Sequence, residues 1–271
     1  MRLPKYIEVE TSRFCNRQCE WCPNHVFKDR TIEELMAWAL FEKVIDSLSS
    51  HDYCGWLAFH NYNEPLANPR LVREVGFARQ HVKQARLTVY TNGDYLTSQL
   101  LDVLASAGLS EMRVTVYPRT IGESSSHEQL WQWLRKKHFL KREKWREVTV
   151  RQGPALELPG SLSVLLISPE VGRYYDRGGI LPSLSIAKRT KPCLMTSHSL
   201  SVDYEGNIKM CCNVVARCDA HRPYVLGNVK ERDLIEVWNS QQFDVLREHH
   251  LRADWSTTPI CSGCRQEIGA H

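Results

Sequence analysis

The sequence lacks the features of membrane, secreted and low-complexity proteins. No run of residues approaches the roughly 18 apolar positions of a membrane-spanning helix, and the first residues lack the apolar core of a signal peptide. No internal repeat or low-complexity stretch occurs. An excess of one charge is also lacking, because 35 Lys and Arg against 31 Asp and Glu leave a net charge of only +4. We therefore expect a soluble, cytoplasmic protein that binds neither membranes nor nucleic acid.

Residues 124–151 are a local exception to the even charge, because lysines and arginines there alternate with Trp131, Trp133 and Trp145. Basic segments with interleaved aromatics can bind RNA. A solvated helix face with its tryptophans turned inward is the more frequent arrangement. We predict a helical, basic segment here and no RNA contact.

The first half of the chain alternates between strand-like and helix-like stretches. Strands are predicted over residues 6–11, 55–62, 86–90 and 112–117, and helices over 31–45, 71–82 and 97–107. Thr31 and Glu34 have the spacing of a helix-capping box. Repeated strand–helix units favour parallel strands joined by crossover helices, so we predict an α/β fold with an open sheet or partial (β/α) barrel. Ligands of such folds sit at the carboxyl ends of the strands.

The pattern changes late in the chain, which we divide into a larger domain, residues 1–185, and a smaller one, residues 186–271. In the smaller domain, residues 199–211 predict a β-hairpin that turns at Gly206. Residues 234–251 have the periodicity of one amphipathic helix. We expect the second domain to be a small appendage of the first.

Cysteine is abundant, and seven of the ten cysteines fall into two groupings typical of metal sites. Three of them have the spacing CxxxCxxC: Cys15, Cys19 and Cys22. Three thiolates leave one iron of a 4Fe–4S cluster open to a small ligand. The other four are Cys193, Cys211, Cys261 and Cys264, and four thiolates suit either zinc or a fully ligated cluster.

Each of these patterns also has a simpler interpretation. A zinc-binding adaptor without enzyme activity would account for all seven cysteines. Glu64, which follows a predicted strand, could be an exposed loop carboxylate, and Asn92 and Gly93 could form a plain turn. Arg177, beside two glycines, could be a surface arginine. We interpret Cys54 as a small core residue and assign no role to His249, His250 or His271.

Several motifs, taken together, resemble the radical S-adenosylmethionine superfamily. They are Cys15-x-x-x-Cys19-x-x-Cys22, Asn63-Glu64-Pro65-Leu66 and Thr91-Asn92-Gly93, each after a predicted strand. Four more resemble its shortened SPASM extension, the twitch domain: Cys193, Gly206-x4-Cys211, Trp238-Asn239-Ser240 and Cys261-x-x-Cys264. The resemblance implies two 4Fe–4S clusters, one binding S-adenosylmethionine and one auxiliary. It further implies that Asn63, Glu64, Asn92 and Gly93 contact the S-adenosylmethionine, with Glu64 accepting its ammonium group.

Tyr90-Thr91-Asn92-Gly93-Asp94 and Arg177-Gly178-Gly179-Ile180-Leu181 resemble a narrower group, the 2-deoxy-scyllo-inosamine dehydrogenases and related aminoglycoside-tailoring enzymes. This resemblance implies that a 5′-deoxyadenosyl radical removes hydrogen from a carbinol carbon of an aminocyclitol or aminoglycoside and that a ketone forms. Arg177 would bind the hydroxyl oxygen, and Tyr90 and Asn213 would line the substrate pocket. A flavodoxin- or ferredoxin-type reductant and a monomeric enzyme are also expected.

The sequence departs from this group at two places. Asn63 stands where the superfamily commonly has glycine. Cys212 and Asn213 stand where the narrower group has an aromatic residue and a carboxylate. A thiol beside a carbon radical is a good hydrogen-atom donor, so Cys212 leaves radical epimerisation open as the alternative to dehydrogenation.

Overall fold

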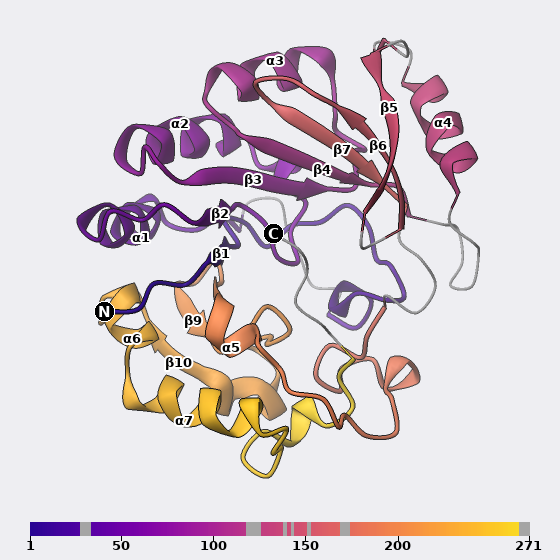
Figure 1. Cartoon of the computed structure of the whole chain (residues 1–271). Helices are drawn as coiled ribbons and strands as arrows, with labels where there is room; N and C mark the ends of the chain where they lie inside the picture. The colour runs from indigo at the N-terminus through magenta and orange to yellow at the C-terminus, as the bar shows by residue number, and fades with distance from the viewer. Residues whose placement is uncertain are drawn as a thin grey trace.

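The computed structural model describes residues 1–27, 34–117, 126–137, 140–141, 144–150, 153–168 and 174–265. An open, curved sheet organises this part of the chain (Figure 1). The described strands follow the order β10-β9-β8-β1-β2-β3-β4-β7-β6-β5. Those from β8 to β7 pair in parallel, and antiparallel strands extend both ends. The sheet is not closed, which confirms the predicted α/β fold with a partial barrel.

The described strands are three to six residues long. Their bounds are β1 Tyr6–Val9, β2 Trp56–Ala58, β3 Arg86–Thr91, β4 Glu111–Thr115, β5 Arg146–Val150, β6 Gly153–Leu158, β7 Ser163–Ile167, β8 Ser199–Val202, β9 Asn207–Lys209 and β10 Val225–Asn228. Strand β1 shows how the two faces differ. Ile7 and Val9 are fully buried in the main apolar core, whereas the alternating Glu8 lies on the opposite, polar face.

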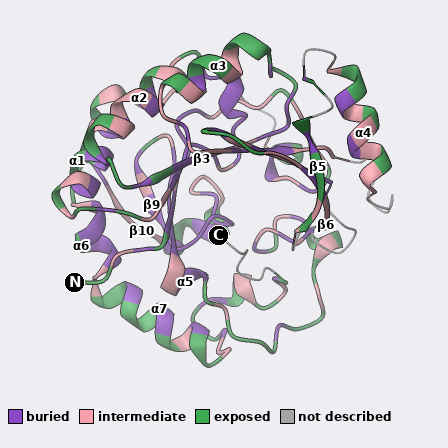
Figure 2. Cartoon of the chain, turned by 45° about the horizontal axis from the view of Figure 1, so that its top comes forward, coloured by how far each residue is buried: buried purple, intermediate pink, exposed green. Residues whose placement is uncertain are grey.

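Helices lie along the outside of the curved sheet and leave the polar face for the site (Figure 2). They are α1 Trp38–Ser50, α2 Leu71–His81, α3 Ser98–Ser106, α4 His127–Lys136, α5 Met195–His198, α6 Leu234–Trp238 and α7 Gln241–Leu251. Three-residue 3₁₀ turns follow the carboxyl ends of two strands at Pro23–His25 and Pro65–Ala67. None of the helices in the described ranges is long and apolar enough to cross a bilayer.

The predicted first helix was placed too early. Thr31 lies outside the described residues, and Glu34 lies in an extended segment before the helix. Its carbonyl accepts from the Arg13 amide at 2.9 Å, and the Met36 amide donates to the Thr11 carbonyl at 2.9 Å. Because these backbone groups pair with the segment after β1, α1 begins only at Trp38.

Two further predictions were wrong in the second half of the chain. Residues 146–150 form strand β5 and not a helix, because they pair with β6 throughout. The single helix predicted over 234–251 is two helices. Asn239 ends α6 by donating from its side-chain amide to the Ile235 carbonyl, and Ser240 caps the start of α7.

The proposed division at residue 185 remains a prediction. Strand β8, which lies beyond this position, pairs in parallel with β1 along its whole length. The central sheet therefore runs through both proposed domains, and residues from both face its polar side.

Candidate active site

The CxxxCxxC loop lies at the carboxyl end of β1. Cys15, Cys19 and Cys22 are partly buried, and the Cys22 amide closes a turn by donating to the Cys19 carbonyl at 2.9 Å. Burial raises the pKa of Cys15 to about 12 and that of Cys19 to about 11. Such thiols ionise only beside a strong positive charge, which a bound iron cluster supplies. The donor set fits a cluster with three cysteine ligands.

Glu64 follows β2 and is tied to this loop, because its amide donates to the Phe14 carbonyl at 2.8 Å. Its carboxylate is only 2% exposed and accepts from the Leu66 amide, the Thr91 hydroxyl and the Asn92 amide. Burial raises the pKa of Glu64, and these three donors oppose the shift. A carboxylate offers about four acceptor positions, so one is left for an ammonium group.

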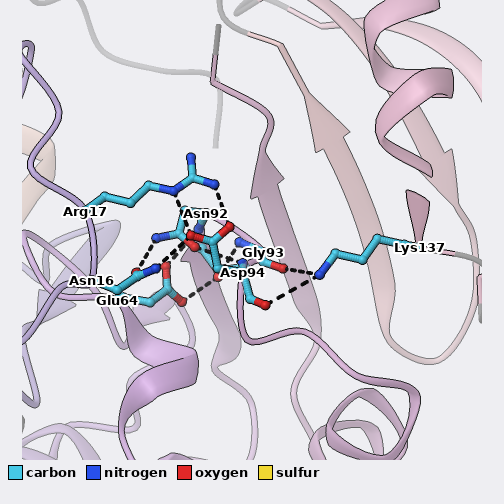
Figure 3. Close-up of polar contacts among 8 residues, drawn as sticks. Asn16, Arg17, Glu64, Asn92, Gly93, Asp94 and Lys137 are labelled. Atoms are coloured by element: carbon cyan, nitrogen blue, oxygen red, sulfur yellow. Dashed lines mark hydrogen bonds and ion pairs between the residues drawn. The ribbon is translucent and has the colours of Figure 1, made fainter. Parts of the chain in front are cut away.

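The turn after β3 completes this edge of the sheet (Figure 3). Gly93 has a φ of +73°, and a Cβ there would lie 2.7 Å from Val114 Cγ1. The position therefore requires glycine. Its carbonyl accepts from Lys137 Nζ at 2.9 Å. Asn92 donates from its side chain to Asn16 Oδ1 at 2.8 Å, which brings the turn against the cysteine loop.

An ion pair that the sequence did not predict joins the same two segments. Arg17, inside the cysteine motif, binds Asp94 through two of its guanidinium nitrogens (Figure 3). Nε donates to Oδ2 at 2.8 Å, and Nη2 donates to Oδ1 at 2.6 Å. Asn16 Nδ2 donates to Asp94 Oδ2 at 2.7 Å. The hydrogen bond from Arg17 lowers the pKa of Asp94. We call Asn16, Arg17 and Asp94 the loop clamp.

The side chain of Asn63 makes hydrogen bonds to neighbouring loop residues. Its Oδ1 accepts from the Asn61 amide at 2.9 Å, and its Nδ2 donates to Ser12 Oγ at 3.4 Å. This side chain thus supports the loop that carries Glu64. The predicted contact of Asn63 with S-adenosylmethionine remains a prediction.

A row of residues that includes Glu8 and Lys209 crosses the polar face of the sheet, and no local pattern in the sequence predicted it. Ser201 on β8 is the register partner of both Glu8 on β1 and Lys209 on β9. Lys209 is 1% exposed, and its ammonium lies 5.7 Å from the centre of the Tyr62 ring. Asn61 Nδ2 donates to Glu8 at 3.1 Å. Burial raises the pKa of Glu8 to about 7, although Lys209 and then Arg177 oppose the shift.

Tyr90 lies beside this row at the end of β3. Its ring stacks on His60 with centroids 4.1 Å apart, and its amide donates to His60 Nδ1 at 3.0 Å. Burial raises the pKa of Tyr90 to about 12. The structure places Tyr90 on the polar face of the sheet, and its contact with a substrate remains a prediction.

Arg177 is held by a turn with three consecutive positive φ values, from Arg177 at +53° to Gly179 at +86°. Buried Asp176 accepts from the Gly178 amide at 3.3 Å and the Gly179 amide at 3.1 Å. His221 holds the other side: its Nε2 lies 2.8 Å from the Gly178 carbonyl, while its Nδ1 accepts from the Val215 amide at 3.0 Å. His221 therefore donates through Nε2 as a neutral ring.

The guanidinium of Arg177 points to the polar face between two tyrosines. Its centre lies 4.3 Å from the ring centre of Tyr175 and 5.7 Å from that of Tyr62. Nη1 donates to Asn213 Oδ1 at 3.0 Å. Nε is buried and has no partner among the described residues. A buried donor of this kind is costly unless a ligand oxygen accepts from it.

Asn213 connects Arg177 to the second group of cysteines. While its Oδ1 accepts from Arg177, its Nδ2 lies 3.7 Å from Cys264 Sγ. Cys264 is one of four cysteines that line a single cavity, together with Cys193, Cys211 and Cys261. The predicted substrate residue and the predicted auxiliary ligand are therefore joined by one side chain.

The four cysteines suit a fully ligated 4Fe–4S cluster. Zinc binds sulfur at about 2.3 Å, so its ligands must crowd around one point. In the described part of the chain, no three His, Cys, Asp or Glu side chains lie close enough to share a metal ion. A 4Fe–4S cluster binds each cysteine through a different iron and needs no such crowding. The cavity fits that group.

Cys212 is buried beside Cys211 and near Arg177. Burial raises the pKa of Tyr175, Arg177 opposes the shift, and the nearby Cys212 thiol adds to it. The thiol thus lies close to the residues that would surround a substrate. Cys54, by contrast, is exposed, so its interpretation as a core residue was wrong. His250, to which the sequence assigned no role, is 1% exposed.

Two family models match the chain. Residues 9–138 match the radical SAM superfamily, and residues 193–265 match SPASM, an iron-sulfur cluster-binding domain. The chain is a radical S-adenosylmethionine enzyme with a SPASM domain. These domains bind S-adenosylmethionine and iron–sulfur clusters, which confirms the predicted cofactors.

This radical S-adenosylmethionine enzyme is similar in sequence to two relatives. It is 28% identical over 264 residues to the S-adenosyl-L-methionine-dependent 2-deoxy-scyllo-inosamine dehydrogenase of Niallia circulans, covering 97% of this chain and 93% of that protein. A second relative is the tungsten-containing aldehyde ferredoxin oxidoreductase cofactor-modifying protein of Pyrococcus furiosus. It is 33% identical over 111 residues, covering 39% of this chain and 28% of that protein.

Solved structures extend the likeness to the fold. The crystal structure of BtrN in complex with AdoMet and 2-DOIA has a TM-score of 0.72 and 26% identity, covering 98% of this chain and 94% of that one. The structure of anSMEcpe with bound AdoMet has a TM-score of 0.55 and 11% identity over 90% of this chain and 83% of that one, and supports the fold alone.

Proposed function

We propose that this radical S-adenosylmethionine enzyme oxidises a hydroxyl group of an aminocyclitol, or of an aminoglycoside that contains one, to a ketone. The observation that carries the proposal is the connection Arg177–Asn213–Cys264. It joins the guanidinium of Arg177, whose buried Nε has no partner among the described residues, to a cysteine that would bind the auxiliary cluster. The likeness to a 2-deoxy-scyllo-inosamine dehydrogenase over 97% of the chain supports the same reaction.

Seven cysteines would hold the cofactors in this proposal. Cys15, Cys19 and Cys22 would bind the cluster that receives S-adenosylmethionine, with Glu64 and the Asn92–Gly93 turn beside the ligand. Cys193, Cys211, Cys261 and Cys264 would bind the auxiliary cluster. When bound, these groups supply the 5′-deoxyadenosyl radical that removes hydrogen from the carbinol carbon and accept the electron released as the ketone forms.

The protein's own residues would bind and orient the substrate. Arg177 Nε would donate to the carbinol oxygen and stabilise negative charge as that oxygen loses its proton. Glu8, whose pKa is raised to about 7, is suited to accept this proton or to bind a substrate ammonium group. Tyr62 and Tyr175 flank Arg177 and would exclude water from the reacting carbon.

Epimerisation is the second candidate, and the burial of Cys212 near Arg177 favours it. A thiol at this position could return a hydrogen atom to the carbon radical from the opposite face, and the thiyl radical left on Cys212 would then take up one electron from the reduced auxiliary cluster and one proton from solvent. The product would then have the mass of the substrate, with one hydrogen derived from solvent through the exchangeable thiol.

The test uses the anaerobically purified enzyme with both clusters, S-adenosylmethionine, a strong reductant and a panel of aminocyclitols in deuterated water. Dehydrogenation predicts a product two mass units lighter that is trapped as an oxime, with or without Cys212→Ala. Epimerisation predicts a deuterated product of otherwise unchanged mass that Cys212→Ala abolishes. A deuterated product of otherwise unchanged mass, lost in Cys212→Ala and formed without any ketone, would overturn the proposed dehydrogenation.

We also propose a small flavodoxin- or ferredoxin-type protein as the reductant, a cytoplasmic location and a monomeric enzyme. The first cluster needs one electron for each S-adenosylmethionine cleaved, which such proteins supply.

A further inference from the structure

The cavity that the auxiliary cysteines share has two polar residues in its wall that belong to no motif. Along with Cys193, Cys211, Cys261 and Cys264, it is lined by His250 and Arg189. Much of the remaining wall is apolar: Met195, Met210, Val214 and Ile260. His250 is 1% exposed and Arg189 is 6% exposed, so both residues are buried in the wall of the cavity.

His250 is fixed on both sides of its ring. Nδ1 lies 3.3 Å from Thr196 Oγ1, and Nε2 lies 3.2 Å from Thr258 Oγ1 and 3.9 Å from Cys261 Sγ. Its carbonyl accepts from the Cys193 amide at 3.0 Å. His250 therefore contacts Cys193 through its backbone, and its imidazole faces the sulfur of Cys261.

Thr258 extends this arrangement. The Thr258 side chain is fully buried with its Oγ1 beside His250 Nε2, and the Thr258 carbonyl accepts from the Cys261 amide at 2.9 Å. With the Thr258 oxygen and the sulfur both next to Nε2, the consistent tautomer carries its proton on Nε2 and accepts at Nδ1 from Thr196.

Arg189 fixes a positive charge in the wall of the same cavity. Its guanidinium donates to the carbonyls of Lys191 at 2.9 Å, Pro192 at 2.8 Å and Cys264 at 3.0 Å. It also stands 5.6 Å from the Trp255 ring centre. These contacts hold the charge beside the segments that carry Cys193 and Cys264.

We propose that His250 with Thr258, and Arg189, raise the reduction potential of the auxiliary cluster and so make it the electron acceptor of the reaction. Hydrogen bonds to cluster sulfurs and nearby positive charge stabilise the reduced, more negative cluster. The consequence rests on the proposed function: each ketone formed passes one electron to this cluster and releases one proton. The shift in potential itself does not depend on any substrate.

The experiment is a redox titration of the full-length enzyme carrying both clusters, followed by electron paramagnetic resonance without substrate. The signal that changes on adding S-adenosylmethionine identifies the first cluster, and the other signal reports the auxiliary cluster. His250→Phe and Arg189→Met should each reduce the equilibrium constant for reducing the auxiliary cluster about tenfold, which is about 59 mV for a one-electron couple. His250→Gln and Arg189→Lys, which keep a donor and a charge, should shift it less.

Iron content and thermal unfolding of each variant show whether a change in potential follows from a lost cluster. Thr258→Val removes only the hydroxyl and should lower the potential even if a change at His250 prevents folding. Unchanged potentials in Thr258→Val and Arg189→Met with full iron content would overturn the proposal. A lowered potential in an enzyme that forms no ketone from any aminocyclitol would overturn the proposed function and leave this inference intact.

Discussion

Arg177 occupies a backbone conformation that favours glycine, and it is followed by two glycines in the same region. A non-glycine residue there costs roughly 1–2 kcal/mol of unfolding free energy. The surrounding residues compensate, since Asp176 and His221 fix the turn from both sides. Arg177 thus has a strained backbone and a buried Nε without a partner among the described residues. Both features are consistent with a role in binding a ligand.

Arg177→Lys should lower the rate of ketone formation about 100-fold, because lysine lacks the Nε donor and the planar fork. Cleavage of S-adenosylmethionine should continue, since Arg177 is not among the residues at the cysteine loop. Chromatography of ketone and 5′-deoxyadenosine in one reaction measures both. Arg222→Lys, at an exposed arginine, is the control. A loss smaller than about tenfold in Arg177→Lys would remove the arginine from the proposed mechanism.

Glu8 predicts a pH dependence of stability. Its pKa is raised from 4.5 to about 7, so the folded state binds a proton that the unfolded state releases. This contribution is present below pH 4.5 and is lost as the pH rises through 7. Between pH 5.5 and pH 7.5 the unfolding free energy should fall by about 2 kcal/mol from this group alone.

Anaerobic urea unfolding of the wild type and Glu8→Gln at the two pH values tests this. In Glu8→Gln, the unfolding free energy should not show the decrease between pH 5.5 and pH 7.5 that comes from Glu8. In Glu231→Gln, which changes an exposed carboxylate, the full decrease should remain. Equal pH dependence in the wild type and Glu8→Gln would show that the carboxylate titrates near its ordinary value.

The sequence identified residues whose role depends on local spacing, and it missed those whose role depends on distant contacts. The cysteines and the Asn92–Gly93 turn are recognisable from their immediate neighbours. Lys209 in a strand resembles an exposed lysine, and only the register with Ser201 places it on the polar face. His250 contacts Thr196, 54 positions earlier in the chain, which no local pattern indicates.

At the level of elements, the loop clamp fixes the cysteine loop to the turn after β3. Asp94→Asn would remove the charge that Arg17 binds. Because this ion pair is partly exposed, the unfolding free energy should change by less than about 1 kcal/mol. The affinity for S-adenosylmethionine should fall about fivefold, since the loop and the turn lose their fixed distance.

Equilibrium dialysis of the anaerobic, cluster-loaded enzyme against S-adenosylmethionine measures this affinity. Asp219→Asn is a matched control, because Asp219 pairs with Arg222 at 3.0 Å on an exposed surface far along the chain. The same affinity in Asp94→Asn and the wild type would mean that the clamp has no part in binding.

The bounds of a helix were predictable where local sequence pattern alone determined them. They were mispredicted where the backbone pairs with residues distant in the chain. Helices α2 and α3 begin within one residue of the predicted positions, with Thr97 capping α3. The start of α1 was misplaced because the segment before it pairs with residues after β1. The break between α6 and α7 had a local signal in Ser240, but the periodicity of apolar residues continued across it.

For the whole molecule, the parallel pairing of β8 with β1 is the decisive feature. It joins the part of the chain that carries the auxiliary cysteines to the strand that leads into the CxxxCxxC loop, within one sheet. The alternation of strands and helices predicted the fold class. The pairing that joins residues nearly 200 positions apart was not predictable from that alternation.

In the proposed reaction, a substrate carbinol loses a hydrogen atom and an electron between these two sites. The most direct test is the reaction of the reduced enzyme with S-adenosylmethionine and an aminocyclitol deuterated at the reacting carbinol carbon. We expect 5′-deoxyadenosine carrying one deuterium and about one ketone for each S-adenosylmethionine cleaved. Deuterium transfer with recovery of a product of substrate oxidation state, carrying solvent hydrogen at that carbon, would contradict it.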